Sequence, residues 1–483
     1  MNQYSEDYLK RWQVLCAVMT GGFMVSVDGS VVNLILPTVV KALMTDFTRV
    51  QWVVISYLLT IIGLIMIMGR LGDILGKKEI YLAGFILFTL GSLLCGLSGS
   101  VWWLIGFRVV QGIGGAMILA LGFAVATQAF PPAERGKAMG MLASVVSLGV
   151  VAGPVIGGFL VKYLSWHWIF FMNLPLGCLG IYMVGKYVPS GIHSPQRSGF
   201  DIPGAVLFFL CMFLLFSGLT LAQKTAFTHV KTMSAFIMSL ICAWLFLKRE
   251  KSIESALIDL SIFSNRALSV NLIVLFLFYF SLSGVFVLAP FYFEDILGYA
   301  PDRIGFLFGG MSVAMAVLSP VSGILSDRMG ASAVILFSLL LMLATFILMG
   351  YGIGPETTGI ACVASMVLIG VSMGFYMSPS HSAVMGGVSW DHLGVVSGLL
   401  ILSRTLGQTA GVAVLGTAWA GWVRFYNNGI LANGITDAPV HTRIEGFRNI
   451  AFSSAALVFF ALMCVLWLVN RQVTFDRIRS VQK

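Results

Sequence analysis

Long apolar runs follow one another along almost the whole sequence, and they limit the fold more than any other feature. Each run can cross roughly 30 Å of hydrocarbon as a helix, which takes about 20 residues. A helix also satisfies its own backbone polar groups in lipid. The runs lie near residues 14–37, 52–69, 80–98, 101–124, 139–163, 168–188, 202–222, 230–247, 269–293, 304–325, 332–350, 359–379, 395–421 and 449–470. The sequence therefore predicts an all-α polytopic membrane protein with about fourteen transmembrane helices.

The composition supports a chain embedded in lipid. Hydrophobic residues make up 58% of the sequence and charged residues only 10%, whereas roughly a quarter of a soluble domain is charged. In a soluble protein, the net charge of +9 would suggest nucleic-acid binding. The basic residues lie mostly in short loops between apolar runs, a distribution typical of topology determinants. We therefore expect no nucleic-acid partner.

The same basic residues predict the orientation. One side of the membrane receives twice as many Lys and Arg as the other, and that side carries both termini. Positively charged loops stay in the cytoplasm. We therefore expect a multi-pass protein of the bacterial inner (plasma) membrane with both termini cytoplasmic. The polar segment 1–11 and the run after it lack a signal-peptide cleavage site, so the first span is expected to be retained.

The sequence predicts neither an enzyme nor a metal or cofactor site. The seven cysteines lie in apolar runs without metal-ligand spacing and are expected to be small buried hydrophobes. The segment Gly72–Lys77 resembles a phosphate-binding loop but is one residue short and lacks the following Ser or Thr. Neither His167 nor His381 has a Ser or Cys partner arrangement.

A short motif, Gly-x-x-x-Asp-x-x-Gly, follows the second run and recurs after the second of the last six runs. Internal repetition of this kind indicates two related bundles. We predict an N-terminal six-helix bundle over residues 1–190, an inserted helix pair over 191–255 and a C-terminal six-helix bundle over 256–483.

The motif is a candidate cytoplasmic gate. Its glycines allow a tight turn, and its aspartate can cap a helix and pair with a cation. An ordinary charged turn is the alternative. The residues assigned to the gate motif are Gly69, Asp73, Gly76, Lys77, Lys78, Asp327 and Arg328.

Asp28 and Arg108 are the candidates for coupling. Asp28 is the only carboxylate well inside a predicted span, and Arg108 lies several residues inside the fourth span. At 1.5 Å per residue, both lie roughly 10–14 Å below the outer surface, so they are expected to pair. Charges inside the membrane are costly and usually functional. We group Gln111, which follows Arg108, with them. The alternative is that Asp28 only neutralises a structural arginine.

The fifth span carries a face of small residues. Gly149, Gly153 and Gly157 lie at i, i+4 and i+8, beside Pro154 and Gly158. Small residues allow close helix contact, and a proline removes one backbone hydrogen bond. We expect a closely packed and kinked helix.

With these motifs in place, the chain resembles the major facilitator superfamily, specifically its fourteen-helix drug/proton antiporter branch. The matching segments are Asp28–Pro37, Gln51–Tyr57, Gly69–Lys78, Arg108–Gly115, Gly149–Gly158 and Trp166–Pro175. The resemblance implies the major facilitator fold and multidrug efflux by proton antiport. It associates Asp28 with coupling or substrate charge, Arg108 with proton transfer, and the helix around Pro154 with antiport.

Two departures from the family pattern shape the expected substrate. Ile74 stands where the gate motif usually has Arg, and Ala331–Ser332 stands where a basic pair would be expected. We find no further membrane acid of the kind that members handling dications often carry, which favours lipophilic monocations or other amphiphiles. The candidates for the substrate cavity are Asn33, Trp52, Tyr57, Phe107, Tyr376 and Arg404. For any single aromatic among them, core packing or lipid contact is the alternative.

The expected partners are protons, a small amphiphilic or cationic substrate and the lipid bilayer, with the chain acting as a monomer. The need for a periplasmic adaptor stays open. Export of an endogenous metabolite, siderophore or lipid is an alternative, because fold does not fix substrate. A membrane sensor without transport is a second alternative.

Overall fold

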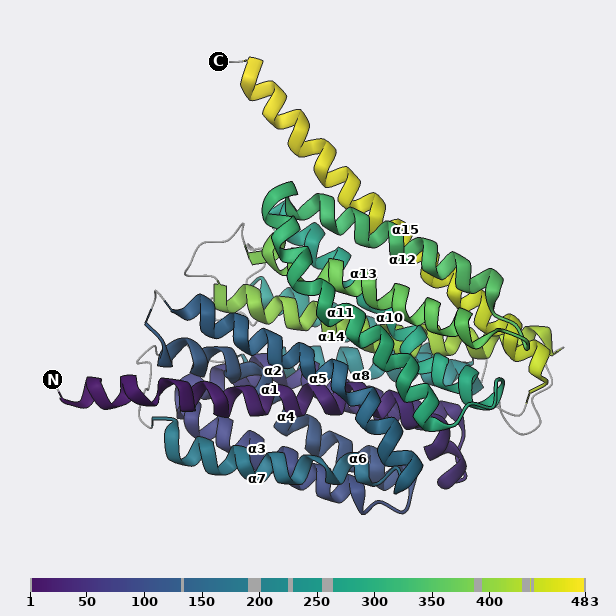
Figure 1. The fold of residues 1–483 in the computed structure, drawn as a ribbon, viewed down its shortest axis with the longest axis horizontal. Helices are drawn as coiled ribbons and strands as arrows, with labels where there is room; N and C mark the ends of the chain where they lie inside the picture. The colour runs from purple at the N-terminus through teal and green to yellow at the C-terminus, as the bar shows by residue number, and fades with distance from the viewer. Residues whose placement is uncertain are drawn as a thin grey trace. The chain divides into compact units, whose positions relative to one another are not determined.

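The computed structural model describes residues 2–131, 134–189, 201–224, 229–253, 264–385, 393–427, 435 and 438–481. Within these residues, the extended regular elements are all α-helices and there is no strand. This confirms the predicted all-α membrane architecture. Figure 1 labels the helices in chain order.

The helices fall into two compact units. The first unit contains nine described helices: α1 (Asn2–Ala42), α2 (Phe47–Leu75), α3 (Lys77–Gly96), α4 (Val101–Ala129), α5 (Arg135–Tyr163), α6 (Trp168–Phe171), α7 (Asn173–Tyr187), α8 (Ile202–Lys224) and α9 (Val230–Glu250). It also includes Tyr299–Phe306, which holds the first residues of α11. The second unit contains α10 (Arg266–Asp295), the rest of α11 (Pro301–Met329), α12 (Ala331–Gly352), α13 (Gly359–Met385), α14 (Leu393–Tyr426) and α15 (Val440–Val481).

Thirteen spans in the described residues are long and apolar enough to cross a membrane. They coincide with thirteen of the predicted runs, and α6 and α7 together form the sixth, Trp168–Tyr187. The remaining run, 139–163, falls on α5, of which Leu148–Tyr163 forms a shorter apolar helix by the same measure. The predicted domain boundaries near residues 190 and 255 lie outside the described residues.

The two gate motifs end their helices in the same way. Gly76 separates α2 from α3 with φ +107°, and Gly330 separates α11 from α12 with φ +87°. Positive φ is easily adopted only by glycine because any Cβ crowds the backbone there. The repeated motif therefore produces a sharp helix break at the same place in each half.

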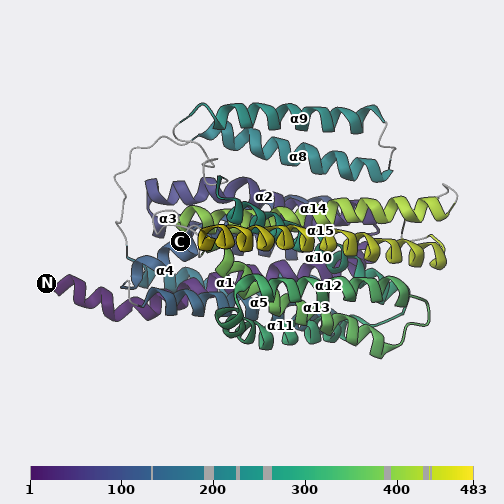
Figure 2. The ribbon, with the colours of Figure 1, turned by 90° about the horizontal axis from the view of Figure 1, so that it is seen from above.

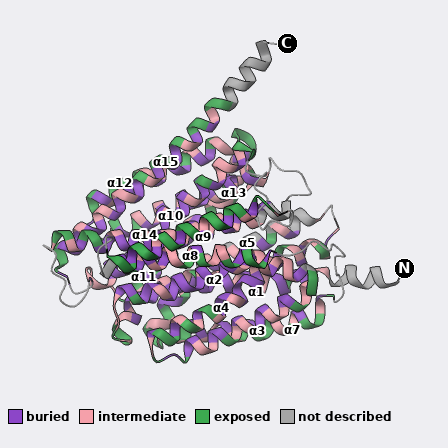
Figure 3. Cartoon of the chain, turned by 180° about the vertical axis from the view of Figure 1, so that it is seen from behind, coloured by how far each residue is buried: buried purple, intermediate pink, exposed green. Residues whose placement is uncertain are grey.

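Glycines also set how closely α3 and α4 pack. A Cβ built on Gly91 would lie 2.6 Å from the backbone nitrogen of Gln111. Real Cβ atoms essentially never come this close to another heavy atom. The contact fixes Gln111, which is 0% exposed, against α3. Figure 3 shows that α1 and α2 contain many buried residues.

Of the helix pair α8 and α9, which the sequence predicts to be an insertion, α8 packs on α2 within the first unit. Phe209 of α8 fills the space above Gly63, and Phe213 lies 6.2 Å from Trp52 between ring centroids. Figure 2 shows α8 and α9 side by side. The outer helix, α9, leaves large apolar side chains exposed, such as Leu240 and Trp244, as expected for a helix in contact with lipid.

In the second unit, serine hydroxyls tie helices together through backbone carbonyls. Ser403 of α14 donates to Leu272 O of α10 at 2.7 Å, and Ser338 of α12 donates to Ser372 O of α13 at 2.7 Å. Such bonds satisfy polar groups that hydrocarbon cannot. They join α14 to α10 and α12 to α13.

Enlarging Gly91 is expected to destabilise the first unit. A methyl group at this position must displace the α4 backbone, so Gly91→Ala should lower the free energy of unfolding by about 1–3 kcal/mol, the usual cost of overpacking. Unfolding of the purified protein in detergent, followed by circular dichroism, measures this.

Gly106→Ala is the matched control, because Gly106 lies in α4 and a Cβ added to it would have nothing within 4 Å. It should be neutral or slightly stabilising, since alanine favours helix. Equal stability of the two variants would contradict the close contact at Gly91.

Candidate functional site

A charged pair lies in the interior of the first unit. Arg108 of α4 contacts Asp28 of α1, with Nη1 2.6 Å from Oδ2. The side chains are 1% and 0% exposed, respectively. The predicted contact between these residues is therefore present, and it joins two helices far apart in sequence.

Uncharged polar side chains complete the carboxylate's surroundings. Gln111 donates from Nε2 to Asp28 Oδ1 at 2.8 Å and to Ser92 Oγ at 2.8 Å. Asn173 donates from Nδ2 to the same carboxylate oxygen at 3.1 Å. Asp28 thus accepts three hydrogen bonds from α4 and α7, while Ser92 of α3 supports two of the donors.

The guanidinium is held on several sides. Arg108 donates to Gln111 Oε1 at 2.7 Å and to Val53 O at 3.1 Å. Its carbon Cζ lies 3.9 Å from the centroid of the Tyr57 ring. A cation over an aromatic face gains electrostatic energy, more so when both are desolvated. Tyr57, a predicted cavity residue, therefore contacts the charged pair directly.

Glycines of the Arg108 segment make room for this arrangement. A Cβ on Gly112 would lie 3.1 Å from Tyr57 O, and a Cβ on Gly115 would lie 3.1 Å from Tyr57 Oη. Side chains at these two positions would crowd α2. The small residues after Arg108 therefore let α2 approach α4 closely enough for the Tyr57 ring to lie under the Arg108 guanidinium.

Two polar atoms at this cluster have no hydrogen-bond partner among the described residues. They are Tyr57 Oη and Asn173 Oδ1, and both are buried. A buried polar atom without a partner costs free energy unless water or a ligand satisfies it. A water molecule or a ligand could therefore bond to the Tyr57 hydroxyl, which can donate and accept, and to the Asn173 amide oxygen, which can only accept.

This geometry has a clear electrostatic consequence. Moving one charge into a low-dielectric interior costs several kcal/mol, which only a close partner and hydrogen bonds offset. Protonation of Asp28 would neutralise the carboxylate and leave Arg108 as the only charge of the cluster.

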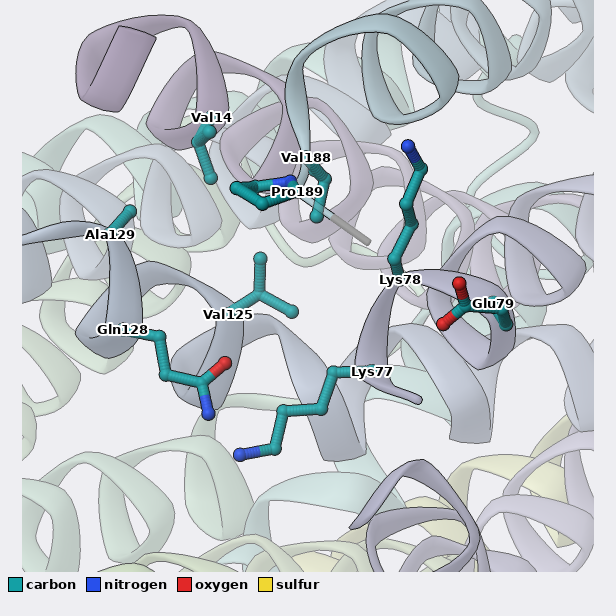
Figure 4. Close-up of a pocket in the computed structure, with 9 residues that line it drawn as sticks. All are labelled: Val14, Lys77, Lys78, Glu79, Val125, Gln128, Ala129, Val188 and Pro189. Atoms are coloured by element: carbon teal, nitrogen blue, oxygen red, sulfur yellow. The ribbon is translucent and has the colours of Figure 1, made fainter. Parts of the chain in front are cut away.

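The gate residues lie at the break between α2 and α3. Lys77 and Lys78 begin α3 and line an open pocket with about 420 Å³ of empty space, some of it open solvent. Figure 4 shows the Lys77 side chain extending along the side of the pocket where Gln128 lies. Gly69 has open space beside it, and the side chain of Asp73 lies outside the described residues. In the second copy, Asp327 and Arg328 are exposed.

The small-residue face of α5 packs as expected. A Cβ on Gly149 would lie 2.8 Å from Phe23 O of α1, and Gly153 and Gly157 meet Ser30 and Val31 of the same helix. Pro154 lies inside α5.

Gly158 faces a different neighbour. A Cβ added to it would lie 2.9 Å from the Cα of Gly305 at the start of α11, within the first unit. Close by, Lys162 Nζ lies 2.6 Å from Asp302 Oδ2.

The other predicted cavity residues do not gather at the charged pair. Trp52 packs on the inserted helix α8, and Phe107 stacks on Trp103 with centroids 5.6 Å apart. Asn33 is half-buried in α1, and its Oδ1 has no partner among the described residues. Tyr376 and Arg404 belong to the second unit.

Sequence reasoning missed Ser92 and Asn173 as site residues. Asn173 begins α7, after the turn at Trp166 and His167 and the short helix α6, so its place in the Trp166–Pro175 motif was the available signal. In that turn, His167 stacks on Trp166 with centroids 3.8 Å apart, and partial burial lowers the pKa of His167 below its ordinary 6.5. Ser92 gives no local signal because serines are common in membrane helices.

Removing only one member of the charged pair is expected to destabilise the protein. Asp28→Asn leaves Arg108 buried without a counter-charge, which typically costs roughly 3–5 kcal/mol. The double variant Asp28→Asn/Arg108→Gln should recover part of that loss. Unfolding in detergent of the parent, both single variants and the double variant gives the coupling energy.

An exposed pair of similar length supplies the control. Glu445 and Arg448 lie 2.7 Å apart with side chains 38% and 35% exposed. Glu445→Gln should change stability by only about 0–1 kcal/mol, because surface pairs contribute little. If Asp28→Asn were equally mild, the buried pair would not be a strong interaction.

Comparison with known proteins identifies the family of this chain. The model of the Major Facilitator Superfamily matches residues 18–412 and 271–478. The chain is 31% identical to the riboflavin transporter RibZ of Clostridioides difficile, covering 85% of this chain and 89% of the relative. It is 29% identical to the multidrug resistance protein Stp of Mycobacterium tuberculosis, covering 86% and 77%. It is 30% identical to the tetracenomycin C resistance and export protein of Streptomyces glaucescens, covering 85% and 76%.

Solved structures share the fold. The inward-facing, unoccupied crystal structure of a bacterial homologue of the human lysosomal transporter Spinster matches with a TM-score of 0.65. The match covers 97% of this chain and 98% of that chain at 16% identity. The helical architecture, the family match and the relatives agree: this chain is a multi-pass membrane transporter that belongs to the major facilitator superfamily.

Proposed function

We propose that this chain is a proton-coupled antiporter that exports lipophilic, cationic drugs or biocides by alternating access. The buried pair of Asp28 and Arg108 is the observation that carries the proposal. Charges inside the membrane are costly and usually mark a functional site, such as a proton relay. Relatives named as a multidrug resistance protein and as a tetracenomycin C resistance and export protein support drugs as the substrates.

The pair supplies a mechanism for coupling. With Asp28 ionised, the ion pair and the bonds from Gln111 and Asn173 hold α1, α4 and α7 together. A proton arriving from outside would neutralise Asp28 and weaken that hold. A cationic solute from the cytoplasm would compete with Arg108 for the carboxylate and favour proton release. Proton and substrate would therefore bind alternately, as antiport requires.

The two unpartnered polar atoms fit a proton route. Tyr57 Oη and Asn173 Oδ1 border the pair and are free to bond a water molecule. Water can bridge polar groups at small enthalpic cost. A water between them would connect Asp28 to the interior of the bundle without moving a helix.

The remaining motifs have matching roles. The sharp breaks at Gly76 and Gly330, with the basic residues Lys77 and Lys78 after the first, would serve as the cytoplasmic gate. The close packing of α5 on α1 would keep water and protons from leaking. In this proposal the protein lies in the bacterial inner membrane with both termini cytoplasmic and acts as a monomer.

A second candidate function is transport of an endogenous metabolite. The observation that favours it is the 31% identity to a protein named as a riboflavin transporter. Deletion of the gene separates the two candidates. Unchanged sensitivity to biocides and dyes, with a metabolite accumulating inside the cells, would reject the drug proposal in favour of the metabolite.

Substrate-driven proton movement in proteoliposomes tests the proposal. Under an imposed pH gradient, lipophilic cations should drive a proton flux through the parent protein. Asp28→Asn should reduce this flux at least about tenfold, because the variant loses the buried carboxylate that would bind the proton. A tenfold loss corresponds to about 1.4 kcal/mol of coupling free energy between proton and substrate. Arg108→Ala should reduce it as well. A pH-sensitive dye inside the vesicles gives the readout.

Two controls accompany this assay. Asp46→Asn changes an acid at the start of α2, where asparagine can still cap the helix, and should leave the flux unchanged. If Arg108→Ala does not fold, Arg108→Lys takes its place in the assay, because lysine keeps the positive charge. Unaltered coupled flux in both Asp28→Asn and Arg108→Ala would overturn the mechanism, whereas a sensor would show no flux in the parent.

A further inference from the structure

The second unit contains an arginine in a transmembrane helix without an acidic partner. Arg404 lies in α14, roughly 9 Å along the helix from Gly398, where the span begins. Its side chain is partly buried. Among the described residues, it makes no hydrogen bond or ion pair. Its contact is with Tyr279 of α10, whose ring centroid lies 5.0 Å from the guanidinium carbon.

An aromatic stack fixes the tyrosine in place. Phe278 lies parallel to Tyr376 of α13, with centroids 3.9 Å apart and 9° between the planes. Phe278 also meets Tyr279 edge to face at 5.7 Å. All three rings are buried, with at most 3% exposure. Arg404 therefore lies on a rigid aromatic platform built by α10 and α13.

The acidic side chains described in the second unit do not offset the charge of Arg404. The carboxylates among the described side chains of the second unit lie at helix ends or in loops; they are Glu294, Asp295, Asp327, Glu356 and Glu445. None of these has an ion pair with Arg404. The charge of Arg404 is therefore not neutralised by a described part of the chain.

The first unit shows what such an arginine ordinarily receives. Arg108 also lies over a tyrosine ring, and Asp28 neutralises it. A guanidinium carries five N–H donors in a planar fork that suits a carboxylate or another acidic oxygen. Arg404 has the tyrosine but lacks the acid, so its donors are available to a ligand.

We propose that Arg404 anchors an acidic oxygen of the transported solute, so that the substrates include compounds bearing a carboxylate or phenolate. The buried rings would hold the guanidinium in place, and its N–H donors would bind the anionic group. This inference rests on the proposed export function and widens its substrates from cations to acidic and amphoteric compounds.

Two dyes with the same xanthene ring test the inference by direct binding. Fluorescein carries a carboxylate and a phenolate, whereas rhodamine 6G is a cation whose carboxyl group is esterified. Fluorescence anisotropy with the purified full chain in detergent gives both Kd values. Arg404→Met keeps side-chain length but removes the charge, and it should raise the Kd of fluorescein at least about tenfold, the usual effect of losing a charge-assisted hydrogen bond. The Kd of rhodamine 6G should stay unchanged or fall.

Arg303→Met is the matched control. Arg303 lies 4.9 Å from the Tyr299 ring centroid, the same pairing as in Arg404, but its side chain is exposed at a helix end. It should change neither Kd. Arg404→Lys should bind fluorescein more weakly than the parent, because a lysine cannot form the planar fork; this variant decides the matter if Arg404→Met does not fold.

Flux separates this inference from the proposed function. If the parent does not bind fluorescein, or if Arg404→Met and Arg404→Lys bind it as well as the parent, the anchor is wrong, even when rhodamine 6G is exported under a pH gradient. If binding of fluorescein depends on Arg404 but no dye movement responds to the pH gradient, the anchor is upheld and proton-coupled export is wrong.

Discussion

The buried ion pair between Asp28 and Arg108 is the interaction on which the first unit depends. Two charges in hydrocarbon are tolerable only when they are close together and fully hydrogen-bonded. This requirement brings side chains from α1, α2, α3, α4 and α7 to one point. Side chains of five helices thus meet at the carboxylate and its arginine, so the loss of either charge would act directly on the packing.

Glycine placement makes that convergence possible. The contacts of Gly91 with Gln111 and of Gly112 with Tyr57 bring α3 and α2 close to α4. In lipid, no hydrophobic force presses helices together, so van der Waals contact and buried hydrogen bonds must do so. Close approach by small residues therefore comes first, and the polar network is possible only because the backbones are already near each other.

Each unit has an arginine over a tyrosine ring, but the two arginines differ in whether their charge is compensated. Arg108 is neutralised within the chain, while Arg404 has no acidic partner among the described residues. A neutralised pair responds to protons and competing cations, whereas an uncompensated cation attracts an acidic group. This difference in charge gives each unit a separate task in the proposed export of amphiphiles, with proton coupling in the first and recognition of an acidic oxygen in the second.

Hydropathy, the repeated gate motif and the isolated charges were enough to predict the helical spans, the breaks at Gly76 and Gly330, and the partnership of Asp28 with Arg108. Each of these follows from a property of one segment: its length, its glycine, or the depth of a charge. The roles of Ser92 and Asn173, the placement of Trp52 against α8, and the tyrosines beneath both arginines needed the tertiary structure. The reason is physical: hydropathy sets which segments enter the lipid, but only the packing of helix faces decides which polar side chains meet.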